Sequence, residues 1–570
     1  MTALAPGTEP APEPAPEPAA ARPGIGRIVG ASVAYVPAVI VAIAGWSHRW
    51  VNEDAFINLR IVDNVLGGHG PVFNPGERIE AATSPLWLWV LVVAKAGFGW
   101  VASAPWIALV ASLVAAVAAF ALGGYGTRLV HRDDIGVAVP VGLLCIAVLS
   151  PVWDFATSGL EMGLVWLWLA ACWLALVTVT RTPETGGRVR IGWCVVIGLG
   201  PLVRPDLGLM MVCFMVAWFV LAHPRRIVPD LAAILALPFA YEIFRMGYFA
   251  SVVPSTALAK DAGGLHLGQG WDYVVDLVAP YHLWIAGLVL VAVVGLRHVA
   301  QHGAFRVATA AMVAAGLVHA GYMIVIGGDY MHGRLLLPAL FALALPASIA
   351  LRRVRGIDLA GMAIVGVAAC WAAFTLVALR PPAPPLGLAV QPIADWRQVA
   401  GGRIVPEDIQ FGLNGLEAHA AYERGVRGFF GVTDKEPRPT DDPDAFVLTL
   451  GSIGLPAWHA GTDIWVIDIG GLAEPLAART EPYPNRPAGH RKQIDPAWYE
   501  ARFGVSTDDE KVQAARRALG CGDGKQLIDA VSAPMTPGRF LSNLWRSPGL
   551  TRMKIPDDPR VAEREWCGTG

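Results

Sequence analysis

Long apolar runs fill most of the chain before Arg380 and constrain the fold more than any other feature. Most come close to the ~20 residues that a helix needs to cross about 30 Å of hydrocarbon. Inside a bilayer, only helices and closed barrels satisfy every backbone hydrogen bond. We therefore predict an α-helical polytopic membrane protein with about eleven transmembrane helices. The eleven runs are Ile28–Ser47, Trp106–Thr127, Gly136–Ser150, Leu160–Thr180, Ile191–Val203, Leu207–Leu221, Val228–Met246, Tyr281–Leu296, Val307–Ile326, Leu335–Leu351 and Leu359–Leu379.

Basic residues between these runs predict how the chain is threaded. Arginine and lysine favour the cytoplasmic side of a membrane. The basic segments fall between alternate runs if Leu86–Val93 is a re-entrant segment or a short half-helix. An odd number of spans then leaves the N-terminus in the cytoplasm and the chain after Arg380 outside it. We predict a multi-pass protein of the cytoplasmic (inner) membrane. The basic segments are Arg128–Arg132, Arg181–Arg190, His223–Arg226, Arg297–Arg306 and Arg352–Arg355.

Charge divides the chain into three parts. It is 54% hydrophobic and 16% charged, and more than half of its charged residues lie from Arg380 onward. Residues 1–25, rich in Ala, Pro and Glu, cannot bury apolar surface, so we expect a disordered cytoplasmic leader. A transmembrane domain over 26–380 and a soluble extracytoplasmic α+β domain over 381–570 should follow. Cys521 and Cys567 in that last domain are candidates for a disulfide. A net charge of −2 gives no basic surplus for nucleic acid.

The loop after the first apolar run, residues 48–85, carries the strongest functional signal. From Trp50 it reads WVNEDAFINLRIVDNVLGGHGPVFNPGERIEAATSP, with Glu53 and Asp54 a few residues from the lipid boundary. Charges this close to hydrocarbon are costly and usually serve a function. Apolar residues after Asp54 recur at helical spacing and predict a helix lying at the membrane interface. The plainer alternative is an ordinary extracytoplasmic loop whose acids are solvated.

Four later motifs place acidic and basic side chains at the ends of apolar runs. The predicted threading collects all four on the side of the first loop, whereas isolated ion pairs or snorkelling side chains would face either side. Arginine and lysine hold phosphate, and carboxylates take protons from hydroxyls, so we interpret the set as a phosphate-and-hydroxyl site. The motifs are SPVWDFATSGLE with Asp154 and Glu161, LVRPDLG with Arg204 and Asp206, PSTALAKDAGG with Lys260 and Asp261, and GGDYMHGRLLLP with Asp329, His332 and Arg334.

Together with the first loop, these motifs resemble those of the GT-C glycosyltransferases, polytopic enzymes that use lipid-phosphate-linked sugars. In particular, they are similar to the terminal β-arabinofuranosyltransferases of mycobacterial and corynebacterial cell walls. The resemblance covers Trp50–Pro338. Ser255 stands where the family usually has Asn, and Leu335 stands where Phe is frequent, yet both motifs keep their charged residue.

The resemblance implies a reaction and a role for each motif. Arabinofuranose would pass from decaprenyl-phosphate arabinose to the arabinan ends of arabinogalactan or lipoarabinomannan. Asp54 is the expected catalytic base or nucleophile, and Glu53 is the weaker candidate. We expect the donor phosphate and sugar to meet Glu161, Arg204, Asp206, Lys260, Asp329, His332 and Arg334. We expect the acceptor to meet His69, Arg78 and Glu80.

Two alternatives and one cofactor question stay open at this stage. A mannosyltransferase using polyprenyl-phosphate mannose is the alternative within the enzyme class, and a lipid or sugar transporter is the alternative outside it. No compact metal motif such as H-E-x-x-H is present. A divalent cation held by Asp54, Asp154, Asp329 and His332 is the alternative to a cofactor-free site. The expected partners are the lipid-linked donor, the polysaccharide acceptor and the bilayer, with the protein acting as a monomer.

Overall fold

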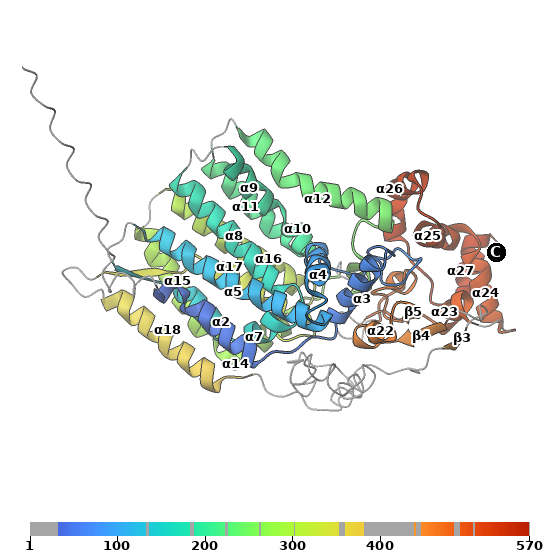
Figure 1. Ribbon diagram of the computed structural model, residues 1–570, viewed down its shortest axis with the longest axis horizontal. Helices are drawn as coiled ribbons and strands as arrows, with labels where there is room; N and C mark the ends of the chain where they lie inside the picture. The colour runs from blue at the N-terminus through green and yellow to red at the C-terminus, as the bar shows by residue number, and fades with distance from the viewer. Residues whose placement is uncertain are drawn as a thin grey trace, which may run out of the picture.

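The fold is an elongated helical bundle with a smaller α+β part at one end (Figure 1). The computed structural model describes residues 32–132, 136–182, 187–222, 226–260, 264–300, 303–352, 359–380, 438–439, 446–483, 491–504 and 508–568. The predicted leader, residues 1–25, and the start of the predicted C-terminal domain, residues 381–437, lie outside these ranges.

Five of the described helices are long and apolar enough to cross a membrane. A sixth span is available if α14 (Leu267–Tyr281) and α15 (Leu283–Ala300), which meet at a bend of 89°, act as one. The protein is therefore a polytopic helical membrane protein. The five long helices are α5 (Ala104–Val130), α8 (Met162–Arg181), α12 (Ile227–Phe249), α16 (Ala304–Val325) and α18 (Leu359–Ala378).

Shorter helices complete the bundle and its connections. Helix α8 lies at the centre and packs against α5, α11, α16 and α17. The contact with α5 is close because a Cβ on Gly163 would stand only 2.3 Å from the Ser112 carbonyl oxygen. The shorter elements are η1 (Val33–Tyr35), α2 (Val36–Ser47), α3 (Ala55–Leu66), α4 (Pro85–Phe98), α6 (Val141–Ala147), α7 (Ser150–Thr157), α9 (Gly187–Gly198), α10 (Gly200–Val203), η2 (Pro205–Leu207), α11 (Gly208–Leu221), α13 (Ser255–Ala259) and α17 (Leu337–Ala344).

Two of the predicted spans differ in the structure. The runs Gly136–Ser150 and Leu335–Leu351 each divide into a short helix and a strand, and β1 (Gly136–Val139) pairs antiparallel with β2 (Ile349–Arg352). Helices α6 and α17 have seven and eight residues. At 1.5 Å per residue they reach only about 10–12 Å, well short of the hydrocarbon thickness. Pro140 and Pro346 stand between helix and strand, where the residue before a proline avoids helical geometry.

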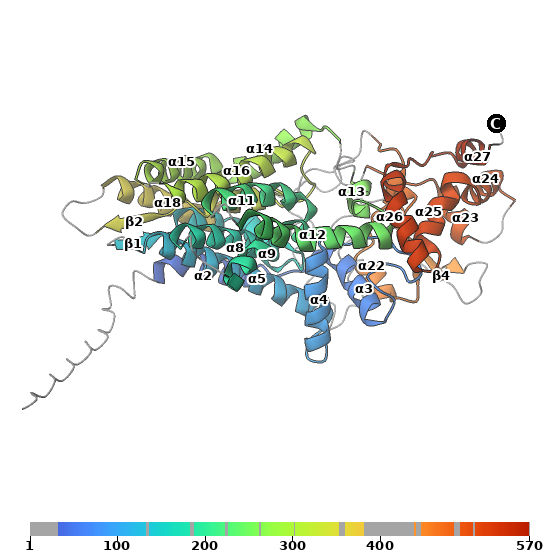
Figure 2. The same cartoon turned by 90° about the horizontal axis from the view of Figure 1, so that it is seen from above.

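The first loop and the segment that follows it form the two helices that the sequence predicts. Helix α3 follows the acidic pair, and α4 occupies the segment predicted as a half-helix. Its 14 residues extend about 21 Å, too short to cross the hydrocarbon. In Figure 2, α4 points away from the bundle, across the direction of the long helices.

The C-terminal part combines a three-stranded sheet with helices. Strand β4 (Phe446–Leu450) lies between β3 (Arg438–Pro439) and β5 (Trp465–Asp468), antiparallel to the first and parallel to the second. Cys521 and Cys567 form a disulfide. The other elements are α22 (Leu455–Ala460), η4 (Ala477–Arg479), α23 (Pro496–Phe503), α24 (Glu510–Leu519), α25 (Gly522–Ser532), α26 (Pro537–Arg552) and α27 (Pro559–Cys567).

The sheet and the first loop share one hydrophobic core. Leu448, Leu455 and Val466 belong to the same buried cluster as Phe56 and Leu59 of α3. The buried Arg60 guanidinium adds hydrogen bonds from α3 to the backbone carbonyls of Ala457, Gly461 and Ile464. Helices α23 to α27 enclose a second cluster around Trp498. The loop predicted to be functional is therefore held between the bundle and the C-terminal sheet.

Candidate active site

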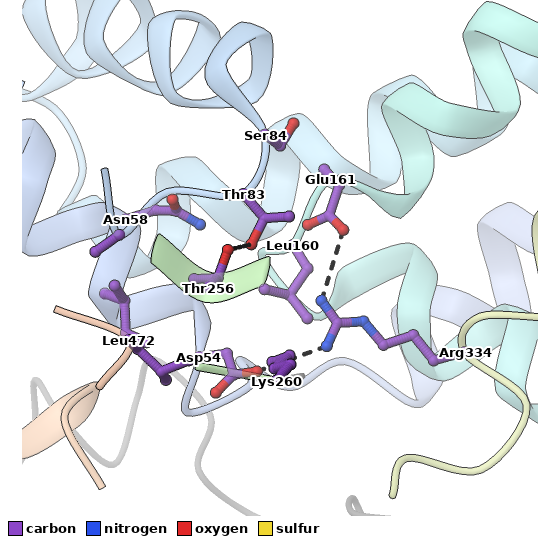
Figure 3. Close-up of a pocket in the computed structure, with 12 residues that line it drawn as sticks. Asp54, Asn58, Thr83, Ser84, Leu160, Glu161, Thr256, Lys260, Arg334 and Leu472 are labelled. Atoms are coloured by element: carbon purple, nitrogen blue, oxygen red, sulfur yellow. Dashed lines mark hydrogen bonds and ion pairs between the residues drawn. The ribbon is translucent and has the colours of Figure 1, made fainter. Parts of the chain in front are cut away.

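Two adjoining cavities lie where the bundle meets the first loop and the C-terminal part. Including the open space at their mouths, the smaller has a volume of about 420 Å³ and the larger about 920 Å³. They share Thr83, Glu161, Thr256, Lys260 and Arg334 in their walls. Figure 3 shows that the side chains around the smaller cavity come from separate elements: α3, the segment before α4, the start of α8, α13 and the loop before α17.

Asp54 stands at the N-terminus of α3 and lines the smaller cavity. An aspartate at this position usually accepts a hydrogen bond from the first turn of its helix. The Asp54 side chain makes no such bond. Its carboxylate lies 3.5 Å from Arg334 Nη1 and accepts a hydrogen bond from the Tyr330 hydroxyl at 3.4 Å. One carboxylate of the predicted pair is thus directed into the cavity, beside a cation.

Arg334 and Arg204 are buried within a network of carboxylates. Arg334 lies 3.5 Å from both Asp54 and Glu161 and 3.7 Å from Asp329. Arg204 binds Glu161 at 3.1 Å and Asp206 at 3.0 Å. His319 of α16 donates to Asp206 at 2.8 Å. These bonds bring together residues from four of the five predicted motif segments, because Glu161 contacts both arginines.

Lys260 follows α13 and lines both cavities. It forms no ion pair with any carboxylate that the structure describes, although the neighbouring Asp261 lies outside the described residues. Thr256, one turn earlier, shares a hydrogen bond of 3.0 Å with Thr83. Lys260 therefore differs from the two arginines, whose charge is already matched by neighbouring carboxylates.

The larger cavity has a mixed lining. Arg204, Asp206 and Asp329 supply charge. Pro205, Tyr322, Met323, Ile326 and Leu335 supply apolar surface from α16 and the adjoining loops, and Arg491 reaches in from the C-terminal part. Such a surface accommodates a molecule that has a charged end and a hydrocarbon end.

Glu53 is placed differently from its neighbour. Its carboxyl is buried and accepts a hydrogen bond from the backbone N–H of Gly454, at the start of α22. Burial, with the adjacent charge of Asp54, raises the pKa of Glu53 to about 7. A Cβ on Gly454 would stand 2.0 Å from the Glu53 carbonyl oxygen. Glu53 thus tethers the loop to the C-terminal part, and its side chain is absent from the walls of both cavities.

His332 also lies behind the cavity walls. Its Nδ1 donates to Asp276 at 2.6 Å, and its Nε2 accepts from the Tyr281 hydroxyl at 3.1 Å. The Tyr281 hydroxyl in turn lies 2.7 Å from Ser150 Oγ. This buried chain fixes the loop that carries Arg334. His332 contacts neither the cavity nor the carboxylates expected beside it.

The four residues expected to hold a divalent cation do not converge. Asp154 pairs with His48 at 3.4 Å, His332 binds Asp276, and Asp54 and Asp329 both face Arg334. Across the described part of the chain, no group of three or more His, Cys, Asp or Glu side chains is placed to bind a metal ion.

The three residues expected on the acceptor side line neither cavity. Glu80 binds Arg245 of α12 at 2.6 Å and accepts from the Tyr241 hydroxyl at 2.7 Å. Arg78 donates to the carbonyls of Ala530 and Ala533. The His69 side chain is exposed in the turn after α3. Glu80 and Arg78 connect the loop to its neighbours.

Several cavity residues escaped the sequence analysis. Thr83, Thr256 and Tyr322 line the cavities and carry no charge, whereas the motifs are distinguished by their charged residues. Tyr330, which donates to Asp54, is uncharged as well. Thr83 and Thr256 do fall inside the motifs that were recognised, so adjacency was an available signal. Arg491 lies far along the chain, and no local pattern connects it with the membrane half.

Comparison with known proteins decides the family. Residues 431–564 match the AftB family C-terminal domain. The chain is 33% identical over 605 residues to a protein of Corynebacterium glutamicum named terminal beta-(1->2)-arabinofuranosyltransferase, covering 92% of this chain and 86% of that protein. The chain belongs to this family. A relative of the same name from Mycobacterium tuberculosis is 32% identical over 614 residues, covering 93% of this chain and 96% of its own. No solved structure gives a match.

Family membership confirms the resemblance seen in the motifs and extends it beyond them. The motif resemblance ended at Pro338, whereas the family-specific C-terminal match begins at residue 431. That region supplies Leu472 to the smaller cavity, Arg491 to the larger one and Gly454 to Glu53. In this family member, the C-terminal region therefore forms part of the cavity walls.

Proposed function

We propose that the protein transfers an arabinofuranosyl group from decaprenyl-phosphate arabinose to the arabinan ends of cell-wall arabinogalactan or lipoarabinomannan. The observation that carries this proposal is the position of Asp54, whose carboxylate makes no capping bond to its own helix and lines a cavity together with Arg334 and Lys260. Two relatives named as terminal arabinofuranosyltransferases, aligned over nearly the whole chain, support the choice of sugar.

The cations assist departure of the lipid phosphate. Transfer breaks the bond between the anomeric carbon and the phosphate oxygen, forms a bond from that carbon to the acceptor oxygen, and releases the acceptor proton. Charge grows on the leaving phosphate, and fixed cations stabilise it. We assign the first contact with the donor phosphate to Lys260, because no described carboxylate pairs with it. Arg204 and Arg334 complete the site as phosphate draws them from Glu161 and Asp54.

Asp54 acts on the acceptor hydroxyl. A general base must lie within hydrogen-bond reach of the hydroxyl that it deprotonates. Asp54 meets this need from the wall of the smaller cavity, and the Tyr330 hydroxyl orients its carboxylate. The family resemblance implies that β donor and β product retain configuration. Asp54 then acts either as a base in a front-face reaction or as a nucleophile, and capture of a glycosyl–Asp54 intermediate distinguishes these two courses.

The larger cavity suits the lipid end of the donor. Its apolar wall of Tyr322, Met323, Ile326 and Leu335 adjoins Arg204 and Lys260, so a phosphate at the cations leaves room for the first isoprene units. The adjoining smaller cavity then receives the sugar and the acceptor hydroxyl.

The proposed topology places the bundle in the inner membrane, with a cytoplasmic N-terminus and an extracytoplasmic active site and C-terminal domain. The alternating basic loops support this threading. An impermeant thiol reagent applied to intact cells should label an introduced cysteine at Lys525 or Arg560. Protection of both positions would reverse the sidedness.

Purified protein in proteoliposomes provides the decisive assay. Radiolabelled decaprenyl-phosphate arabinose and an arabinan acceptor should give labelled polysaccharide, whereas decaprenyl-phosphate mannose should give none. Transfer from the mannose donor alone would support the mannosyltransferase alternative. Movement of intact donor between leaflets without any product would support a transporter.

A further inference from the structure

Helix α26 presents an apolar pair to solvent on the C-terminal part. Leu541 is 64% exposed and Trp545 is 89% exposed. Residues four positions apart lie on the same face of a helix, so these two side chains share one face. The opposite face is buried through Asn543, Ser547 and Leu550. Large exposed apolar side chains that share a face indicate a contact surface.

The packing of α26 fixes its location at one end of α12. Asn543 donates to the Gly247 carbonyl at 3.1 Å, and the Phe540 ring presses on Gly247, where a Cβ would stand 2.3 Å from ring atoms. Thr551 Oγ1 accepts a hydrogen bond from the backbone N–H of Val252, just beyond α12. Figures 1 and 2 both show α26 at this end of α12.

The position of Gly247 along α12 sets the depth of α26 in the membrane. Gly247 follows the first residue of α12, Ile227, by 20 positions, which at 1.5 Å per residue is about 30 Å, the thickness of the hydrocarbon. The surface of α12 stays apolar and exposed as far as Phe239 and Ile243. The hydrocarbon therefore ends within about one turn of Gly247, and α26 lies at the level of the headgroups.

The charge of α26 suits that level. Its sequence, PGRFLSNLWRSPGLTR, contains Arg539, Arg546 and Arg552 and no acidic residue. Tryptophan favours the boundary between headgroups and acyl chains, and arginine there reaches the lipid phosphates. Amphipathic helices with a basic polar face and Trp or Leu on the other face lie in this interface.

We propose that α26 is a membrane-surface helix. Leu541 and Trp545 insert at the boundary between headgroups and acyl chains, and Arg546 and Arg552 bind the phosphates of anionic phospholipid. The contact joins the C-terminal part to the bilayer as well as to α12. It thereby holds Leu472 and Arg491 at a constant height in the cavity walls. The inference uses the depth of α12 and is independent of which leaflet lies at this end.

Site-specific photo-crosslinking tests the contact without donor or acceptor, so its outcome is separate from that of the transfer assay. The variant Trp545→benzoylphenylalanine is reconstituted in nanodiscs of phosphatidylcholine with or without phosphatidylglycerol, and lipid adducts are measured by mass spectrometry. The matched control is Arg560→benzoylphenylalanine, an exposed position on α27 at the far end of the C-terminal part (Figure 1). We expect at least about fivefold more lipid adduct at position 545, and more with phosphatidylglycerol.

Further variants make either outcome informative. The double variant Arg546→Gln/Arg552→Gln should remove the preference for phosphatidylglycerol, and Leu541→benzoylphenylalanine provides a second probe if the variant at Trp545 is poorly expressed. Equal adduct yields at positions 545 and 560 would overturn the proposal. Crosslinks from position 545 to a second copy of the chain, without lipid, would assign the surface to a protein interface and would also overturn it.

Discussion

Replacement of Asp54 by asparagine separates its catalytic role from a structural one. Asparagine keeps the size of the side chain and its capacity to accept the hydrogen bond from Tyr330. It cannot take a proton from the acceptor or attack the anomeric carbon. The variant should therefore fold and bind donor while transfer is lost.

The expected loss of folding free energy and the expected loss of turnover differ in size. Asp54 makes one ion pair with Arg334 at 3.5 Å, its side chain is 21% exposed, and Arg334 keeps Glu161 and Asp329. Loss of one partly exposed pair costs about 0.2–1 kcal/mol of folding free energy. Loss of a general base lowers the rate about 10²–10⁴-fold, which raises the barrier by about 3–5 kcal/mol. The effect on turnover should clearly exceed the effect on stability.

Glu53→Gln provides the matched control, one residue away. The Glu53 side chain faces Gly454, and glutamine can still accept the hydrogen bond from that N–H. The measurements are single-turnover transfer from radiolabelled donor, donor affinity and thermal unfolding, each on both variants in the same liposomes. We expect Glu53→Gln to keep turnover within about threefold, because its side chain contacts no cavity.

Near-normal turnover in well-folded Asp54→Asn protein would refute the catalytic role of Asp54. Selective loss of turnover with Glu53→Gln would also refute it and would move the base by one residue. Equal loss in both variants, together with lowered unfolding temperatures, would indicate damage to the loop.

Four further predictions follow from named contacts. Lys260→Ala should raise the donor KM by about 10–100-fold while Lys260→Arg largely restores it, and an unchanged KM in both would remove Lys260 from the phosphate site. Gly454→Ala should cost about 1–3 kcal/mol of stability through its clash with the loop, seen as faster proteolysis between loop and C-terminal part; wild-type resistance would argue against this contact. Folded Glu53 holds its proton up to about pH 7, whereas the unfolded chain loses it near 4.5, so thermal stability should fall as pH rises through this window, and less steeply in Glu53→Gln; identical profiles would contradict the assignment. Cys521→Ser/Cys567→Ser should lose about 2–4 kcal/mol, because the disulfide closes a separation of 46 residues, and unchanged unfolding of the C-terminal part would refute that role.

Local patterns predicted several elements correctly. The helix predicted after Asp54 is α3, and the short half-helix predicted at Leu86–Val93 is α4. Each depends on a periodic pattern or a breaker within one segment. The two runs predicted as spans divide into helix and strand, because high apolarity indicates burial without fixing the backbone conformation.

Charge and motif order were enough to select the cavity residues Asp54, Glu161, Arg204, Lys260 and Arg334. They did not determine which neighbour faces the cavity. Glu53 and Asp54 are adjacent and chemically alike. Only the position of Gly454, 401 residues away, reveals that one side chain is a tether and the other is free to act.

Sequence alone therefore determined the class of protein, the family and most of the charged residues that line the cavities. Tertiary structure decided which partners each charged residue contacts. His332 binds Asp276 and Tyr281, Glu80 binds Arg245, and Arg491 reaches the larger cavity. The physical reason is the range of the interactions. Hydrophobic periodicity acts within a few turns, whereas ion pairs and buried hydrogen bonds join residues that become neighbours only when the chain has folded.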